Sequence, residues 1–471
     1  MKIRFLIFLG FFACTTLFAQ SEESTAYTLD ECINAAIQNN PNLKMVRLDA
    51  MSNEVFFNQS KNALLPNING SYNLGVANGR NIDPFTNSYV DERLTFSNAG
   101  LGLDATVFNG FRLINGWKQS KLNLKAAEME IEAAKQTLIL EVTLAYLRVL
   151  SEKDLVVLAN ARIKTTEDQL ARLQTFYDAE TGNPAEYHDL QGQLAADLAN
   201  LAENKNTLKS AILSLNTLVN PSERITATSL SNELEIEKYA YTADEVYTQS
   251  LNVFPTIKSN QLSLASADKG VSIARSQFTP EVSLFAGLNT NFSSAARRFN
   301  ETGRSIVGTN DFVSVNNQDY QVLSNQTNYA SLEIPYGDQF ENNLNSSFGI
   351  AVTIPILNGF RAKNNVTLQQ IKLSEAETTL EQTKLDLKEA IGQSYNSMQA
   401  AFERYQLLKG QVDAYRESFR INEIRFNSGV SNSVDYLVSK NNLDNAEINL
   451  SNVRYAYTLR AKVLEYYRVG L

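Results

Sequence analysis

The residues that most often do chemistry in proteins are scarce in this sequence. Its one histidine, His188, stands beside Asp189, and such a pair alone is weak support for acid–base catalysis. No G-x-S-x-G sequence marks a serine nucleophile, and there is no Walker lysine motif or dinucleotide fingerprint. No cysteine and histidine cluster has metal-ligand spacing. We therefore expect a protein that is not an enzyme, without catalytic residues, bound metal or cofactor.

The start of the chain has the features of a secretory signal. Lys2 and Arg4 precede an apolar run at residues 5–12, and Ala19-Gln20 is a plausible cleavage site. We expect residues 1–19 to be removed as a signal peptide. The competing interpretation makes Cys14 a lipidated residue after cleavage.

The charge of the chain after signal removal excludes one class of partner. Without Lys2 and Arg4, 40 basic residues face 51 acidic residues, so the net charge is −11. This acidic balance argues against nucleic acid, which needs basic patches. No later stretch approaches 18 uncharged apolar residues. If the chain enters a membrane, the remaining option is a β-barrel.

One five-residue sequence occurs twice in the chain with a single difference. FNGFR at 108–112 is followed 249 positions later by LNGFR at 357–361, and residue classes match at that offset for about eighty residues. Earlier segments match at an offset of 214, so the second copy carries an insertion of 35 residues between Pro280 and Phe348. Because this stretch is polar and aperiodic, we expect a long surface loop. The predicted organisation is a first repeat at 20–220, an equatorial linker at 221–240 and a second repeat at 241–471.

Each repeat contains a predicted helical hairpin. Apolar residues from Leu124 to Val149 recur at alternating steps of 3 and 4, which is typical of a helix packed along neighbours. Residues 112–178 and 361–428 contain no proline and few glycines, so each is predicted to form one long helix. Turns at 180–184 and 429–433 should join these helices to returning helices, which we expect at 186–217 and 435–468.

Four segments alternate between apolar and polar residues with a period of two. Their apolar members are Ile68, Tyr72, Leu74 and Val76, then Leu101, Leu103, Ala105 and Val107, then Val282, Leu284, Ala286 and Leu288, and finally Phe348, Ile350, Val352, Ile354 and Ile356. This pattern fits membrane strands with lipid on one side and water on the other. A soluble antiparallel sheet with one solvated face would show it too.

Four strands cannot close a membrane barrel, whereas three chains would supply twelve. The predicted junctions between strand and helix are Phe108, Gly110, Phe111 and Arg112 in the first repeat and Gly359, Phe360 and Arg361 in the second. In this interpretation the aromatic residues anchor at the interface, Asn-Gly permits the bend, and the arginines meet lipid phosphates.

These features resemble the TolC-type outer membrane efflux protein family. The resemblance covers nearly the whole chain and is most specific in TLDECINAAIQNNPNLK, ALLPNINGSYNLG, the two NGFR junctions and RFNSGVSNSVDYLVSKNNL. It implies a mixed α/β membrane protein with long antiparallel helical hairpins that form a periplasmic tunnel. Each chain would add four β-strands to a trimeric 12-stranded outer-membrane barrel.

The resemblance also implies a periplasmic gate at the helix tips. Asp435 matches a gate acidic residue, Glu186 is its counterpart in the first repeat, and Phe426 matches a gate tyrosine. Three symmetry-related carboxylates around a pore would repel each other and attract cations. A first-turn charge favoured by the helix dipole explains Asp435 equally well. Val438 and Ser431 depart from the family pattern, which expects an aspartate and an arginine there.

The function implied is a passive exit duct for efflux or type I secretion in the outer membrane. Its partners would be two further copies of the chain, a periplasmic adaptor (membrane fusion) protein, a proton-driven or ATP-driven inner-membrane pump and outer-membrane lipid. The adaptor would dock at the tips, which comprise Gly182, Asn183, Pro184, Gly429, Val430 and Ser431. The alternative is a periplasmic coiled-coil scaffold or adhesin without transport activity.

Overall fold

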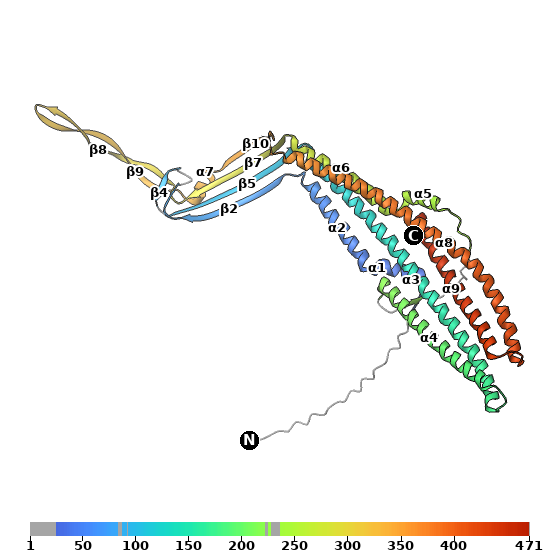
Figure 1. The fold of residues 1–471 in the computed structure, drawn as a ribbon. Coiled ribbons are helices and arrows are strands. Elements are labelled where there is room, and N and C mark those ends of the chain that lie inside the picture. The colour runs from blue at the N-terminus through green and yellow to red at the C-terminus, as the bar shows by residue number, and fades with distance from the viewer. Residues whose placement is uncertain (1–24, 83–86, 92, 222–224, 228–235, 471) are drawn as a thin grey trace, which may run out of the picture. The chain divides into compact units, whose positions relative to one another are not determined.

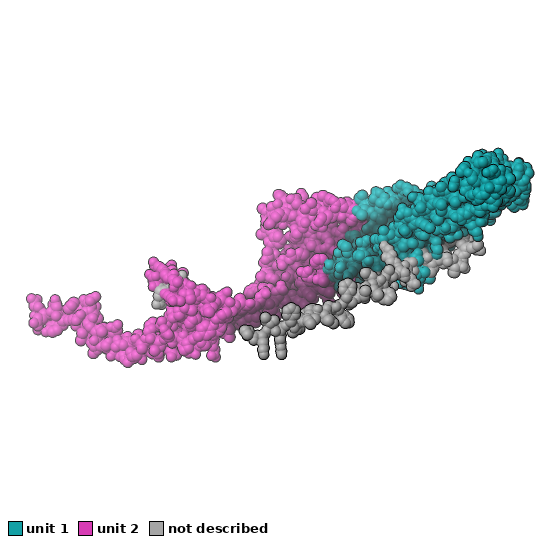
Figure 2. All heavy atoms as spheres, turned by 90° about the horizontal axis from the view of Figure 1, so that it is seen from below, with its two compact units in different colours: residues 1–53, 124–263, 377–471 teal, residues 54–123, 264–376 magenta. Residues whose placement is uncertain are grey.

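The computed structural model describes residues 25–82, 87–91, 93–221, 225–227 and 236–470. The predicted signal peptide and Cys14 lie outside the described residues. Two compact units divide the chain (Figure 2): residues 1–53, 124–263 and 377–471 belong to unit 1, and residues 54–123 and 264–376 belong to unit 2.

Both halves of the chain contain the same succession of main elements. The first half contains α1 (Leu29–Asn39), α2 (Pro41–Asn62), β2 (Asn67–Ala77), β5 (Leu94–Phe108), α3 (Arg112–Asp178) and α4 (Pro184–Val219). The second contains α5 (Ala243–Val253), α6 (Pro255–Arg275), β7 (Glu281–Ser293), β10 (Asn345–Thr353), α8 (Arg361–Asn427) and α9 (Ser433–Val469). The predicted long helices are confirmed, and α3 and α8 each contain 67 residues.

Matching caps start the corresponding short helices. Thr28 accepts a hydrogen bond from the backbone of Glu31, whose carboxylate accepts one from the backbone of Thr28. Thr242 and Glu245 repeat this arrangement at the start of α5. Such capping boxes satisfy backbone donors that would otherwise lack partners.

Unit 1 is a set of helices held together by local apolar clusters. The largest cluster includes Cys32 of α1, Val142 and Tyr146 of α3, and Leu215 of α4. Beside it, β1 (Thr25–Tyr27) pairs in parallel with β6 (Ile225–Ala227), so part of the predicted linker at 221–240 forms a strand. Figure 1 shows the hairpins α3–α4 and α8–α9 with their turns at the same end.

Unit 2 contains a four-stranded antiparallel sheet in the order β10-β7-β5-β2. One row across the sheet pairs Ile68 with Leu103, Leu103 with Ala286, and Ala286 with Phe348. A row of opposite parity joins Ser71, Gly100, Asn289 and Asn345. Because directly paired residues share a face, the sheet has one apolar and one polar face, as the alternation predicted. The apolar face is uncovered within one chain, and Phe348 is 88% exposed.

The prediction of a long surface loop in the second repeat is wrong. Residues of the insertion form a long hairpin of β8 (Arg297–Val315) and β9 (Gln318–Glu333), followed by α7 (Tyr336–Asn342), as Figure 1 shows. Asn316 and Asn317 at its turn both have positive φ, which suits a two-residue hairpin loop. A shorter hairpin joins β3 (Arg80–Ile82) to β4 (Tyr89–Asp91). Long two-stranded ribbons need no buried face, so the periodicity that marks a half-buried strand was weak here.

The two NGFR sequences are turns with the same backbone. Gly110 and Phe111 have φ of 65° and 62°, and Gly359 and Phe360 have φ of 61° and 59°. In each copy the arginine N–H donates to the carbonyl of the asparagine three residues earlier, at 3.2 Å for Arg112 and 3.3 Å for Arg361. Two positive φ values with this bond are the signature of a type I′ turn. The repeated sequence therefore encodes a bend from strand into helix.

The junction glycines provide a matched test of these turns. A Cβ on Gly110 would lie 1.9 Å from Thr279 Oγ1, whereas a Cβ on Gly359 would meet no atom within 4 Å. We expect Gly359→Ala to lower the free energy of unfolding by about 1–2 kcal/mol through left-handed strain alone. Gly110→Ala should add roughly 1–3 kcal/mol of overpacking. Thermal unfolding in detergent measures both, and equal effects would contradict this description.

Candidate functional site

The tips of the two hairpins are turned by residues at equivalent positions. Glu180 and Gly429, 249 positions apart, have φ of 54° and 70°. Gly182, the glycine of the first tip, does not have a positive φ. Asn183 and Asn432 cap the returning helices, accepting hydrogen bonds from the backbone of Ala185 at 3.1 Å and Asp435 at 2.9 Å. Asparagine is among the residues preferred at helix N-caps, because its side-chain oxygen accepts from a free backbone N–H.

Each tip is clamped by a stacked aromatic pair. Tyr177 and Tyr187 stack with ring centroids 4.7 Å apart, and Phe426 and Tyr436 stack at 4.9 Å. The second pair is buried with Leu190 of α4, while Tyr177 is exposed. Phe426 thus lies in a packed cluster that joins α4, α8 and α9.

The predicted gate carboxylates occupy the first turns of the returning helices. Glu186 lies in the first turn of α4 and Asp435 in that of α9. Asp435 is exposed, Glu186 is half-buried, and neither of these two described residues forms an ion pair with the other. A different contact links the helix starts, because Ser433 Oγ donates to Asp189 Oδ2 at 2.9 Å. His188 is exposed and stacks edge-on against Tyr177.

The residues predicted to dock an adaptor lie in these turns. Pro184 begins α4, where its missing N–H leaves no helical bond unmade. Val430 at the second tip is an exposed apolar side chain, and Ser431 follows it with its hydroxyl lacking a hydrogen-bond partner.

A buried ionic network lies behind the tips in unit 1. Lys440 of α9 is 2% exposed, and its Nζ lies 3.1 Å from Asp197 of α4 and 2.9 Å from Asp444. Arg162 of α3 pairs with Asp444 at 3.3 Å. Thr166 Oγ1 donates to Asp197 at 2.7 Å. Two cations and two carboxylates thus join three helices with their charges balanced, as buried charges require.

Hydrogen bonds within this network act on the pKa of Asp197. Burial disfavours the carboxylate of Asp197, but bonds from Thr166 and Gln193 and the charge of Lys440 together hold its pKa below the ordinary aspartate value. Burial raises the pKa of the neighbouring Tyr436 hydroxyl, with nearby carboxylates adding to the shift. Asp197 therefore remains ionised at neutral pH.

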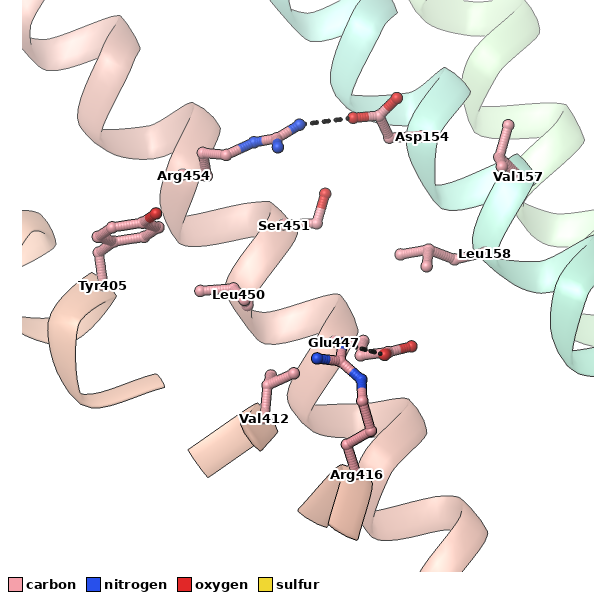
Figure 3. A pocket seen from close by; sticks show the side chains of 10 residues that line it. All are labelled: Asp154, Val157, Leu158, Tyr405, Val412, Arg416, Glu447, Leu450, Ser451 and Arg454. Carbon is pink, nitrogen blue, oxygen red and sulfur yellow. Dashed lines mark hydrogen bonds and ion pairs between the residues drawn. The ribbon is translucent and has the colours of Figure 1, made fainter. Parts of the chain in front are cut away.

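A groove of about 340 Å³ lies between α3, α8 and α9 (Figure 3). Arg454 pairs with Asp154 at 3.0 Å and Arg416 with Glu447 at 3.0 Å across it. Tyr455 donates to Asp154 at 2.7 Å, and burial with this carboxylate raises the pKa of Tyr455 to about 12. The groove is lined by side chains that cross-link helices rather than by a nucleophile and its base.

In the described part of the chain, no helix is both long and apolar enough to cross a bilayer. Within the same residues, no group of three or more histidine, cysteine or carboxylate side chains could hold a metal ion.

Sequence reasoning missed the ionic network. A signal was present, because Lys440 follows Tyr436 by four residues and precedes Asp444 by four, which places all three near one helix stripe. Its partners Arg162, Thr166 and Asp197 come from other helices, and no local spacing identifies them.

The network predicts a pH-dependent stability. Asp197→Asn should lower the free energy of unfolding at pH 7 by about 1–3 kcal/mol, because Lys440 loses a charged partner. Because the pKa of Asp197 is lower in the folded state than in the unfolded state, its carboxylate stabilises the fold at pH values above the unfolded-state pKa. This stabilisation is lost as the pH falls through the folded-state pKa. The variant and the parent should therefore converge as pH falls below about 4. Denaturation followed by circular dichroism tests this, with the exposed Asp49→Asn as control, and a difference independent of pH would contradict it.

The sequence matches the family model described as outer membrane efflux protein over residues 32–220 and 246–465. The outer membrane protein TolC of Vibrio cholerae is 21% identical over 458 residues, covering 96% of this chain and 92% of that protein. TolC of Escherichia coli is 22% identical over 448 residues, covering 93% and 81%.

Solved structures share the fold. The CusC structure superposes with a TM-score of 0.75 at 15% identity, covering 97% of this chain and 95% of that one. The outer membrane protein VceC of Vibrio cholerae gives 0.73 at 16% identity, covering 94% and 96%. The Neisseria gonorrhoeae MtrE outer membrane channel gives 0.72 at 18%, covering 94% and 89%. With the family model matched over most of its length, the chain belongs to the outer membrane efflux protein family.

Proposed function

We propose that three copies of this chain form an exit duct in the outer membrane, which passively conducts substrates of an efflux or type I secretion system. The observation that carries the proposal is the sheet of unit 2. Its two outer strands, β10 and β2, each have one side that pairs with no other strand of the sheet, and its apolar face is exposed. Three such sheets joined edge to edge give twelve strands, with apolar side chains towards lipid and polar ones towards water.

The rest of the duct follows from the same division of the chain. The repeats at 20–220 and 241–471 each add a long hairpin to a helical tunnel in the periplasm. A periplasmic adaptor docks at the two turns, and an inner-membrane pump, driven by protons or ATP, supplies the energy. The chain itself acts without catalysis or cofactor. The exposed Val430 and the paired turns support docking at this end.

The gate of the duct lies at the tips. Glu186 and Asp435 start helices that return from the turns, so three copies place six carboxylates around the tunnel mouth. Phe426, packed on Tyr436, holds α8 against α9 beside them. Carboxylate rings of this kind attract cations and slow their passage.

Replacing both Glu186 and Asp435 with Ala should weaken block of single-channel current by divalent cations, because the acidic ring is lost. The measurement is conductance in planar bilayers across a range of Mg²⁺ concentrations. Asp178→Ala and Glu180→Ala together remove the same charge from the far side of one turn and should have a smaller effect. Block that is unchanged in the first variant would remove these residues from the gate.

A photoreactive side chain at Asn183 or Asn432 should capture the adaptor in intact cells. The identity of the captured adaptor then distinguishes a proton-driven pump from an ATP-driven exporter. The same group at Asn206, within α4, serves as control. Efficient labelling without an adaptor, or a protein found in the periplasmic extract without detergent, would contradict the duct.

A further inference from the structure

A polar cavity of about 370 Å³ lies where the sheet of unit 2 meets the starts of the two long helices. Both NGFR turns contribute to it in the same way, with Asn109 and Arg112 from the first and Asn358 and Arg361 from the second. Glu281 and Thr353 close it from the ends of β7 and β10. The repeat has therefore brought two equivalent arginines to one cavity.

The cavity opens on the polar side of the sheet. Glu281 pairs with Thr353 in the continuous register that also pairs Asn289 with Asn345. These residues are separated by even numbers of positions, so their side chains share one face. The cavity therefore lies on the side opposite the apolar face.

The charges at the cavity are unequal. Arg112 pairs with Glu281 at 3.4 Å, which leaves one cation and one carboxylate balanced. Arg361 donates through Nε to the carbonyl of Asn358 at 3.1 Å, and it has no ion pair with a carboxylate among the described residues. The starts of α3 and α8 add the partial positive charge of two helix dipoles. The cavity is therefore electropositive.

A buried donor without a partner lines the same cavity. Asn109 is 7% exposed, and its Oδ1 accepts a hydrogen bond from the backbone of Leu113 at 3.3 Å. Its Nδ2 is buried and has no acceptor. Because Oδ1 is engaged by a backbone N–H, the free atom must be the donor nitrogen. Buried donors of this kind are satisfied in nearly all proteins, so an acceptor is missing here.

We infer that the cavity is a binding site for a phosphate-class oxyanion. The planar fork of Arg361 suits two oxygens of a phosphoryl group, and the Asn109 amide with the remaining N–H groups of Arg112 supplies further donors. The anion comes either from a soluble phosphate compound or from a phospholipid headgroup. The position of the cavity on the polar face of the sheet favours the soluble compound as the source. The binding site itself does not depend on the proposed function, and only its placement inside a duct rests on that proposal.

The test measures binding of inorganic phosphate by calorimetry to the full chain in nanodiscs of phosphatidylcholine. Arg361→Gln should weaken binding roughly tenfold or more, since charged hydrogen bonds to the fork are lost. Asn109→Asp keeps the acceptor that caps Leu113 and replaces the donor with a carboxylate, so it should abolish binding. Glu281→Gln removes the one carboxylate at the cavity and should tighten binding. This gain cannot arise from misfolding.

Arg304→Gln is the matched control, because Arg304 is an exposed arginine of β8 and its loss changes the net charge equally. A second arm uses nanodiscs with phosphatidylglycerol and counts lipid retained by the parent and by Arg361→Gln in native mass spectrometry. Arg361-dependent retention without phosphate binding would assign the site to a headgroup. Equal behaviour of Arg361→Gln and Arg304→Gln in both arms would overturn the inference. Trimer mass and conductance, recorded on the same samples, report separately on the duct.

Discussion

A helix of 67 residues cannot bury its own apolar side chains, and this constraint governs unit 1. Isolated helical turns gain little in water, so long helices are stable only when they pack along neighbours. α3 does so through separate clusters along its length, from Val142 near α1 to Ala159 and Ile163 near Leu201 of α4. The last cluster, around Tyr436, lies close to the tips. Among the described residues of unit 1, packing is therefore distributed over several clusters along the helices.

Apolar contacts between helices tolerate a shift of one helix along its neighbour by one turn, because one aliphatic side chain then takes the place of another at a modest cost in free energy. The network around Lys440 does not, because its charges are satisfied in only one register of α3, α4 and α9. Buried ion pairs add little net stability compared with apolar packing, but they specify alignment. The network thus fixes the register of α3, α4 and α9 behind the tips.

Unit 2 has the opposite problem. Its sheet leaves the backbone groups of β10 and β2 without partners on their outer sides, and one whole face is apolar and uncovered. Such edges and faces invite association. Assembly of three chains would satisfy the edges and lipid would cover the face, so the features that make a single chain incomplete are those that the proposed duct requires. The polar face, in contrast, carries asparagine and serine side chains, which would contact water.

The sequence by itself determined the repeat, the long helices, the alternating strands and the family, because each is written as a local period or an extended match. The caps at Thr28 and Asn432 were equally local. Sequence reasoning failed at two local features and at the contacts between residues far apart in the chain. The β8–β9 hairpin lacks a buried face to impose a period, and Glu180 takes the left-handed position that a glycine fills in the other tip. Only the tertiary structure joined Lys440 to Asp197 and set Arg112 beside Glu281, since contacts across more than a hundred residues depend on packing rather than spacing.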